Sequence, residues 1–316
     1  MKKLFPVISL SVLALVLVLG ACAPKQRFVT IATGGTAGTY FPLGGALAEI
    51  WNKNIKGMNA NATSTGASAA NIAMLKDAKV DVIFVQNDAA YYALTDTEAY
   101  AGKGMKDIKG LASLYDETCQ LVALESSGIK TITDLKGKRV SVGAAGSGVE
   151  LNARQILEAA GLTYDDIKVQ YLSFAESASN LKDGNIDAAF NTAGAPTAAI
   201  QDLSASKKII LVAVDGDVAA KLMAKWSFYT PTVIPANTYQ NVAADVMTVS
   251  VKSMLAVSAK LDDKTVYDML KTMFANGDRL AASHKKGADV TLKSSTDGMS
   301  IPLHPGAEKF YKENKK

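Results

Sequence analysis

A glycine-rich stretch near the start of the chain, ATGGTAGTYFPLGGALAEI (residues 32–50), combines five glycines with threonine and tyrosine hydroxyls. Glycine allows a backbone to approach a ligand closely, and the first turn of a helix has N–H groups without partners inside the helix. The helix dipole adds partial positive charge there, so such ends bind carboxylate or phosphate groups. Because the loop contains no Lys or Arg, backbone N–H and hydroxyl groups would hold the anion.

A second loop, GAAGSG (residues 143–148), has a similar composition and also precedes a helical pattern. A phosphate-binding P-loop needs Gly-Lys-Ser/Thr, which occurs nowhere in the chain. A dinucleotide loop needs glycines at i, i+2 and i+5, but after Gly146 and Gly148 the third place is Leu151. Two interpretations remain: the loops bind a ligand, or they are tight turns with ordinary helix N-caps, Ser147 among them.

Polar residues also cluster at two strand ends and before one further helix. These segments are TSTGASAAN (63–71), VQND (85–88) and NTAGAP (191–196). Side chains at the carboxyl ends of strands line ligand sites in α/β sheets, and the same residue types can cap the next helix. Gln86 and Thr192 are the better candidates for a ligand site, whereas we expect Asp88 to be the N-cap of the helix that follows it.

The chain contains an internal repeat. LKDAKVDVIFVQND from residue 75 and LKDGNIDAAFNTAG from residue 181 share Leu, Lys, Asp, Asp and Phe at an offset of 106. The loops GTAGTY (35–40) and GAAGSG (143–148) occur in the same order at an offset of 108. Two ordered pairs at nearly one offset predict two similar lobes whose loops face a common cleft.

Around these motifs, strand and helix patterns alternate, which is typical of βαβ units and largely parallel sheets. We expect strands at 28–32, 80–85, 120–124, 139–143, 168–172, 186–190 and 208–214, and helices at 42–54, 71–78, 88–94, 150–162, 177–184, 245–261 and 263–276. The expected fold class is α/β with two lobes. We assign residues 28–117 with 236–316 to the first lobe and 118–235 to the second, so that the chain crosses twice at a hinge.

The N-terminus, MKKLFPVISLSVLALVLVLGAC, has the basic start, apolar run and small residues of a secretory signal. Leu19-Gly20-Ala21-Cys22 resembles the bacterial lipobox, which implies a signal peptide at 1–21, lipidation of Cys22 and a short tether at 22–27 that holds the protein at a membrane. The alternative is a single membrane anchor helix. With Cys22 lipidated, Cys119 has no disulfide partner in the chain.

Composition and missing motifs restrict the function classes. With 316 residues, 48% apolar residues and a net charge of +4, the chain can bury a core, and it shows no basic stripe with interleaved aromatic residues for nucleic acid. Its two histidines, His284 and His304, belong to no cluster with metal-ligand spacing. No G-x-S-x-G nucleophile elbow occurs. We therefore expect neither an enzyme nor a cofactor.

Taken together, these motifs resemble the TRAP-associated extracytoplasmic immunogenic (TAXI) solute-binding proteins over residues 28–312. The resemblance rests on IATGGTAGTYFPLGGALAEIWN, STGASAANIAML, DVIFVQND, DLKGKRVSVGAAGSGVELNARQILEAAGL, LKDGNIDAAFNTAGAPTAAI and IPLHPGAEKFYKE. It implies a two-lobed, periplasmic-binding-protein-like fold (type II), in which each lobe is a mostly parallel sheet flanked by helices. It also implies capture of a small carboxylate or amino acid, of the glutamate or dicarboxylate class, for a TRAP-type permease driven by an ion gradient. Because the loops contain no basic side chain, a zwitterion would fit as well as a dianion.

Position by position, the resemblance and the loop chemistry mark the same ligand-binding candidates. They are Thr36, Gly38, Thr39, Tyr40, Thr65, Ser68, Gln86, Gly146, Ser147, Gly148, Thr192, Ala193 and Gly194. Asp116 departs from the family pattern, which often has proline there, so the stiffness of the crossing segment is in doubt. We expect a monomeric, extracytoplasmic, membrane-anchored protein, in the periplasm or at the cell surface. A ligand sensor for a receptor and, less favoured, a secreted enzyme on the same fold are the alternatives.

Overall fold

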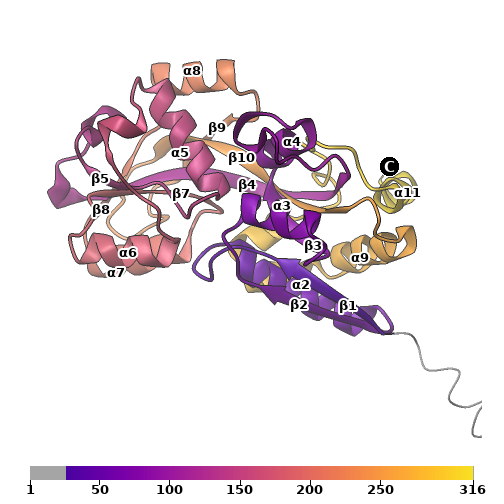
Figure 1. Cartoon of the computed structure of the whole chain (residues 1–316). Helices are drawn as coiled ribbons and strands as arrows, with labels where there is room; N and C mark the ends of the chain where they lie inside the picture. The colour runs from indigo at the N-terminus through magenta and orange to yellow at the C-terminus, as the bar shows by residue number, and fades with distance from the viewer. Residues whose placement is uncertain (1–25, 316) are drawn as a thin grey trace, which may run out of the picture.

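The computed structural model describes residues 26–315, and these form two lobes that lie side by side (Figure 1). Two long strands, β4 (Ile108–Leu124) and β10 (Val246–Ser258), run through both lobes. Because both lobes share β4 and β10, all the strands of the two lobes belong to one ten-stranded mixed sheet with helices on its faces. The α/β two-lobed fold is therefore confirmed. The signal peptide, Cys22 and most of the expected tether lie outside the described residues.

The first lobe is built on three parallel strands in the order β2-β1-β3, followed by the antiparallel β10 and β4. The N-terminal half of the chain supplies β1 (Arg27–Ala32), α2 (Tyr40–Asn54), β2 (Met58–Thr63), α3 (Ser68–Lys76), β3 (Val82–Gln86), α4 (Asn87–Thr95) and η2 (Glu98–Tyr100). The C-terminal part adds α9 (Asp263–Ala275), α10 (Gly277–Ser283), η6 (Lys285–Asp289) and α11 (Pro305–Asn314). In Figure 1 these yellow and orange helices lie beside the indigo N-terminal elements.

The second lobe repeats the arrangement, with parallel strands β6-β5-β7 next to the antiparallel β4. Its elements are η3 (Glu125–Ser127), η4 (Ile132–Leu135), β5 (Arg139–Ser141), α5 (Gly148–Ala159), η5 (Tyr164–Asp166), β6 (Lys168–Gln170), α6 (Phe174–Lys182), β7 (Ala188–Ala193), α7 (Ala198–Ser206), β8 (Ile209–Val212), α8 (Gly216–Lys225) and β9 (Thr230–Ile234). β8 pairs with β4, and β9 pairs with β10.

The internal repeat corresponds to the structural repeat. α3 begins at Ser68 and α6 at Phe174, 106 residues later, and the strand that follows each helix is displaced by the same number. α2 begins at Tyr40 and α5 at Gly148, which is the offset of 108 between the two loops. The prediction of two similar α/β lobes from the sequence is confirmed.

One element was predicted wrongly. Residues 245–261 were expected to be a helix, but 246–258 form β10, whereas the helix expected at 263–276 is present as α9. β10 contains four Val residues, and Val favours strands. It is buried along almost its whole length, since β4 pairs along it on one side while β3 and β9 pair with different parts of it on the other. Continuous burial removes the alternation that identifies a half-exposed strand, so the apolar spacing resembles that of a helix.

The lobes are joined where β4 and β10 lie side by side. Asp116 and Lys252 are register partners on these strands, and Lys252 Nζ lies 2.6 Å from Asp116 Oδ1. The segment after β9 still packs with the second lobe, since Tyr239 and Val242 belong to its core cluster. The chain therefore returns to the first lobe along β10.

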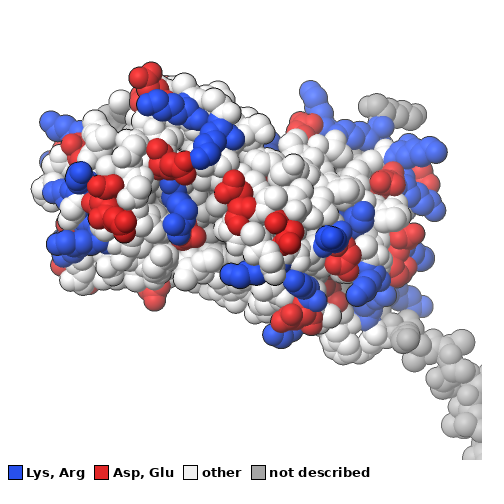
Figure 2. All heavy atoms as spheres, turned by 45° about the horizontal axis from the view of Figure 1, so that its top comes forward, with Lys and Arg blue, Asp and Glu red and all other residues white. Residues whose placement is uncertain are grey.

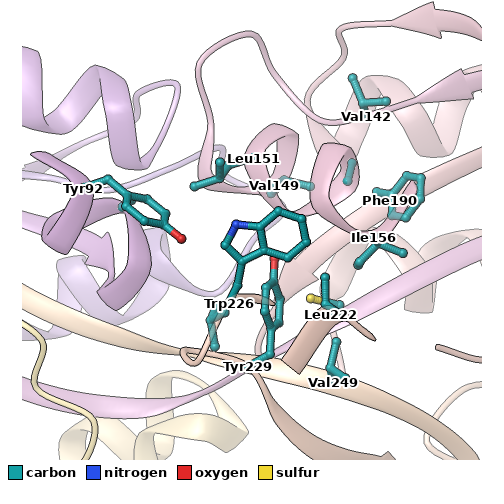
Figure 3. Packing of buried hydrophobic residues seen from close by; sticks show 14 of the residues in the cluster. Tyr92, Val142, Val149, Leu151, Ile156, Phe190, Leu222, Trp226, Tyr229 and Val249 are labelled. Atoms are coloured by element: carbon teal, nitrogen blue, oxygen red, sulfur yellow. The ribbon is translucent and has the colours of Figure 1, made fainter. Parts of the chain in front are cut away.

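A hydrophobic core continues from one lobe into the other. Trp226 and Tyr229, which follow α8, lie between Tyr92 of α4 and Ile156 of α5 (Figure 3). Separate clusters fill the outer part of each lobe. Between residues 26 and 315 no helix is long and apolar enough to cross a membrane.

Candidate functional site

A cavity lies between the two lobes and encloses about 600 Å³ of empty space, part of it open to solvent. The first lobe contributes the glycine-rich loop, the Ser/Thr-rich segment after β2, the end of β3 and two residues of β4. The second lobe contributes the 143–148 loop, the start of α6 and the end of β7. Both loops of the repeat therefore face the same space, as the internal repeat had predicted.

Most of the residues marked from the sequence lie around this cavity. Those that line it are Gly38, Thr39, Tyr40, Thr65, Ser68, Gln86, Ser147, Gly148, Thr192 and Ala193. Three others, Thr36, Gly146 and Gly194, do not line it. Thr36 is exposed, in the turn before α2.

Gly146 and Gly194 instead contribute carbonyl groups that hold the lobes together. The N–H of Ala69 on α3 donates to the Gly146 carbonyl at 3.2 Å. The hydroxyl of Thr39 donates to the Gly194 carbonyl at 3.3 Å. Each bond links the first lobe to the second, so the structure is closed around the cavity.

Gly148 of the second lobe lies against Gln86 and Ser68 of the first lobe. A Cβ atom at position 148 would overlap Gln86 Oε1 and lie 2.9 Å from Ser68 Oγ. A side chain at this position would therefore displace the Gln86 amide or the start of α5. Glycine allows the backbone of α5 to approach the Gln86 side chain this closely.

Three helices begin at the cavity wall. α2, α3 and α5 begin at Tyr40, Ser68 and Gly148, and all three residues line the cavity. The Ser147 hydroxyl caps α5 by accepting from Glu150 N at 3.1 Å. This cap does not use the N–H groups of Gly148 and Val149, which have no partner inside the helix. The cap interpretation of Ser147 is confirmed, and the capped helix begins at the cavity wall.

The sequence reasoning missed Glu117 of β4, which lines the cavity and is only 2% exposed. Gln86 Nε2 donates to Glu117 Oε2 at 3.0 Å, while Glu117 Oε1 has no hydrogen-bond partner among the described residues. Burial raises the pKa of the Glu117 carboxyl to about 7. An acidic residue between Tyr115 and the apolar run QLVAL is the signal that could have marked it.

Neutral hydroxyl groups surround this carboxyl. Tyr40 and Tyr115 line the cavity beside Glu117, and Ser253 of β10 lies near it. The hydroxyl oxygens of Tyr40, Tyr115 and Ser253 are buried and have no hydrogen bond of normal geometry within the described chain. Buried polar groups are rarely left without partners, so this cluster marks a place where a polar ligand can supply them.

Gln86 also connects the cavity to a buried network between the lobes. Its Nε2 donates to Asn152 Oδ1 of α5 at 3.1 Å. Asn152 Nδ2 in turn donates to Asp88 Oδ2 at 3.0 Å and to the Tyr229 hydroxyl at 2.8 Å. Burial raises the pKa of Asp88 to about 6. Asp88 was expected to be an N-cap; that prediction was wrong, because Gln86 is at the N-cap position of α4.

The rest of the wall is apolar and carries no basic side chain. Phe174 packs over the glycine-rich loop, where a Cβ at Gly38 would lie 3.4 Å from its ring. None of the residues that line the cavity is Lys, Arg or His. The outer surface differs, since basic and acidic side chains are interspersed over the face shown in Figure 2. Within residues 26–315 no group of His, Cys, Asp and Glu could hold a metal ion.

A family model matches residues 31–314, described as the NMT1-like family. The chain belongs to the NMT1-like family. The matched region runs from β1 into α11, so it contains every residue of this cavity wall.

Solved structures with the same fold are distant in sequence from this NMT1-like chain. The alkanesulfonate-binding protein SsuA from Xanthomonas axonopodis pv. citri, bound to MOPS, matches with a TM-score of 0.53 and 16% identity over 91% of this chain and 84% of that one. PhnD1 from Prochlorococcus marinus, in complex with methylphosphonate, has a TM-score of 0.54 and 10% identity over 91% and 98%. A putative L-cystine ABC transporter protein from Listeria monocytogenes has a TM-score of 0.51 and 19% identity over 84% and 98%. At these identities the likeness shows the periplasmic-binding-protein-like fold.

Proposed function

We propose that this protein is an extracytoplasmic solute-binding protein that captures a small carboxylate or amino acid and delivers it to a membrane permease. One observation carries the proposal: a single cavity between the lobes receives both loops of the internal repeat and the starts of three helices. Helix starts suit a carboxylate, and the unpartnered buried hydroxyls suit a polar solute. The similar structures, which include a sulfonate-binding protein and a methylphosphonate complex, support binding of a small anionic group.

Capture works through closure of the lobes. A solute in the cavity contacts both lobes, so it stabilises the closed state by its differential affinity for that state. β4 and β10 are the two connections that bend, and they lie together at the pair Asp116–Lys252. The bonds Ala69–Gly146 and Thr39–Gly194 form only when the lobes meet.

The site favours binding over catalysis. Asp88 and Glu117 are two buried carboxyls that could in principle act as an acid and a base. Asp88, however, is already occupied, since its Oδ1 accepts from Ala89 N at 2.7 Å and its Oδ2 from Asn152. Glu117 alone faces the cavity, and a lone carboxyl without a nucleophile or a second titrating group does not make a hydrolytic or transfer site.

The proposed permease is of the TRAP type. The sequence resemblance to TAXI proteins supports this, whereas the similar protein from Listeria monocytogenes is a putative L-cystine ABC transporter protein. The two types differ in energy source, which gives a direct test. Uptake of the identified solute by cells that contain this protein should stop when the ion gradient is collapsed while ATP is maintained. Uptake that continues without the gradient and stops on ATP depletion would assign the protein to an ABC importer.

Solute capture itself is tested by Gln86→Ala. The variant removes the amide that reaches Glu117 and Asn152, so affinity for a carboxylate or amino acid should fall by about tenfold or more. Gln201→Ala on α7 is the control, because Gln201 is exposed and away from the cavity. Calorimetric titration measures both. Equal affinities in the wild type and Gln86→Ala would contradict the site.

A further inference from the structure

We infer that the solute is a zwitterionic amino acid with an uncharged side chain, whose ammonium group is held by Glu117 and whose carboxylate is held by helix-start N–H groups. This inference rests on the proposed solute-binding function and narrows its solute class. Three features carry it: a buried carboxyl with no positively charged partner, the absence of any cation in the cavity wall, and the apolar character of the remaining surface.

Glu117 needs a cation that the protein does not supply. Its Oε1 is buried and makes no hydrogen bond of normal geometry, and its Oε2 accepts from the uncharged amide of Gln86. The Tyr40 and Ser253 hydroxyls that also interact with the carboxyl are uncharged. Burying an ionised carboxylate is costly unless a positive charge is paired with it. The hydroxyls of Tyr40 and Tyr115 are nearby, but they are neutral. An ammonium group has three N–H donors, and it can bind Glu117 Oε1 together with these hydroxyls.

Basic side chains close to the wall are already engaged or neutral. The stem of Lys286 packs against Gly194, where a Cβ would lie 2.6 Å from its Cγ. Its ammonium, however, pairs with Asp289 at 2.8 Å. The neighbouring His284 has a pKa lowered by burial, so it is uncharged at neutral pH. Neither residue lines the cavity.

The N–H groups at the helix starts form the subsite for the carboxylate of the solute. The Ser147 hydroxyl accepts from Glu150 N, and this leaves the N–H groups of Gly148 and Val149 at the cavity wall. Together with the partial positive charge of the helix end, these donors suit one carboxylate. A second carboxylate, as in succinate or the side chain of glutamate, would be buried beside Glu117 without a counter-ion. The site therefore selects against dicarboxylates and acidic amino acids.

The rest of the wall suits a neutral side chain. Apolar groups line it, in the form of Ala67, Ala144, Val149, Phe174 and Ala193. Contact with such groups favours an aliphatic stem by removing apolar surface from water. A charged side chain would lose hydration there without gaining an ion pair.

Calorimetric titration at pH 8 tests the inference on protein that was first unfolded and refolded to remove any carried-over solute. The probes are alanine, valine and glutamine, their deaminated analogues propionate, 3-methylbutanoate and glutaramate, and the acids glutamate and succinate. At least one neutral amino acid should bind about 30-fold or more tightly than its deaminated analogue. In Glu117→Gln its affinity should fall by a similar factor. Glu125→Gln, at an exposed position outside the cavity, should leave its affinity unchanged within twofold.

The results of these titrations distinguish a failure of the inferred solute class from a failure of the proposed solute-binding function. Tighter binding of succinate or glutamate than of every neutral amino acid, or equal affinities in the wild type and Glu117→Gln, would overturn the inference and leave solute capture intact. Binding of none of the probes would overturn both the inference and the proposed solute class. The comparison between each amino acid and its deaminated analogue uses only the wild-type chain, so it decides the matter even where Glu117→Gln does not fold.

Discussion

Gln86 Nε2 donates a hydrogen bond of 3.0 Å to Glu117 Oε2, and this bond spans β10, whose Ser253 pairs with Gln86. The same nitrogen donates to Asn152 of the second lobe at 3.1 Å. One amide therefore links the buried acid of the cavity to the opposite lobe. Because the Asn152 bond crosses from one lobe to the other, the position of Gln86 connects the chemistry of the cavity with the arrangement of the lobes.

Gly148→Ala should block this closure. The added methyl group would overlap Gln86 Oε1, which two hydrogen bonds on its amide nitrogen hold in place. Gly148 does not have a positive φ, so alanine is tolerated by the backbone and the lobes themselves should fold normally. Solute affinity should fall by at least about tenfold, equivalent to about 1.4 kcal/mol, while the midpoint of urea unfolding of the ligand-free protein stays close to that of the wild type.

Gly45→Ala is the matched control for that experiment. A Cβ at Gly45 meets nothing within 4 Å, and the residue lies inside α2. Alanine there should raise the free energy of unfolding by up to about 1 kcal/mol and leave solute affinity unchanged. If Gly148→Ala binds solute as well as Gly45→Ala does, close contact at Gly148 is not required for closure.

Cys22→Ser should release the protein from membranes. Cys22 lies outside the described residues, and the prediction rests on the sequence Leu19-Gly20-Ala21-Cys22 and on the anchoring provided by acyl chains. Cys119→Ser is the control, because Cys119 is buried in β4 and has no part in the lipobox. Fractionation should find Cys22→Ser in the soluble fraction and Cys119→Ser with the membranes. A membrane-bound Cys22→Ser protein would show that another segment anchors the chain.

The ligand-free protein should lose stability as the pH rises from about 4 to about 7. Burial raises the pKa of Glu117 from 4.5 to about 7 and that of Asp88 from 3.8 to about 6. The folded state therefore binds more protons than the unfolded state in this range, and the free energy of unfolding falls with pH. Each carboxyl accounts for a loss on the order of 3 kcal/mol.

Urea unfolding of the ligand-free protein at pH 4.5, 5.5, 6.5 and 7.5 measures this slope. In Glu117→Gln the part of the slope that Glu117 causes should disappear, and the part due to Asp88 should remain. Carboxyls whose pKa is lowered, such as Asp187 beside Arg139, affect stability below this range and do not obscure it. A stability that rises between pH 4.5 and 7.5 would contradict the buried state of both acids.

The outline of the fold was predictable because it depends on local patterns. The glycine loops, the helix starts and the strand ends could be recognised in the sequence, because each βαβ unit carries its own turn signals. The two copies of the repeat are separated by 106 and 108 residues. The same local signals placed Gln86, Ser147 and Thr192 at strand or helix ends, and the structure brings these residues to one cavity.

What could not be predicted depends on contacts between distant segments. From the sequence alone, Glu117 is assigned to a polar connector, SLYDETCQ. In the structure it is a buried strand residue because it pairs with Val251 of β10. β10 itself was taken for a helix, since two of the strands that bury it, β3 and β4, lie more than a hundred residues earlier in the chain. Without β10 in place, the sequence shows no reason for an acid to be buried at residue 117.

The pH dependence of solute affinity should distinguish an ammonium ligand from a second carboxylate. If Glu117 binds an ammonium group, it must be ionised in the complex. Below its pKa of about 7 in the free protein, binding then requires loss of a proton, so affinity should fall by up to about tenfold per pH unit as the pH decreases. A dicarboxylate would show the opposite trend, because protonation of Glu117 removes the repulsion.

Other groups that face Glu117 do not titrate in the same range, apart from Asp88. Burial raises the pKa of Tyr40 and Tyr115 well above their usual values and that of Cys119 to about 12. Asp88 has a pKa of about 6 and can add a weaker dependence at lower pH through its charge. Titrations of a neutral amino acid between pH 5.5 and 8.5 should therefore show a break near pH 7 in the wild type. The break should be absent from Glu117→Gln, and an affinity that rises toward low pH in the wild type would contradict an ionised Glu117 in the complex.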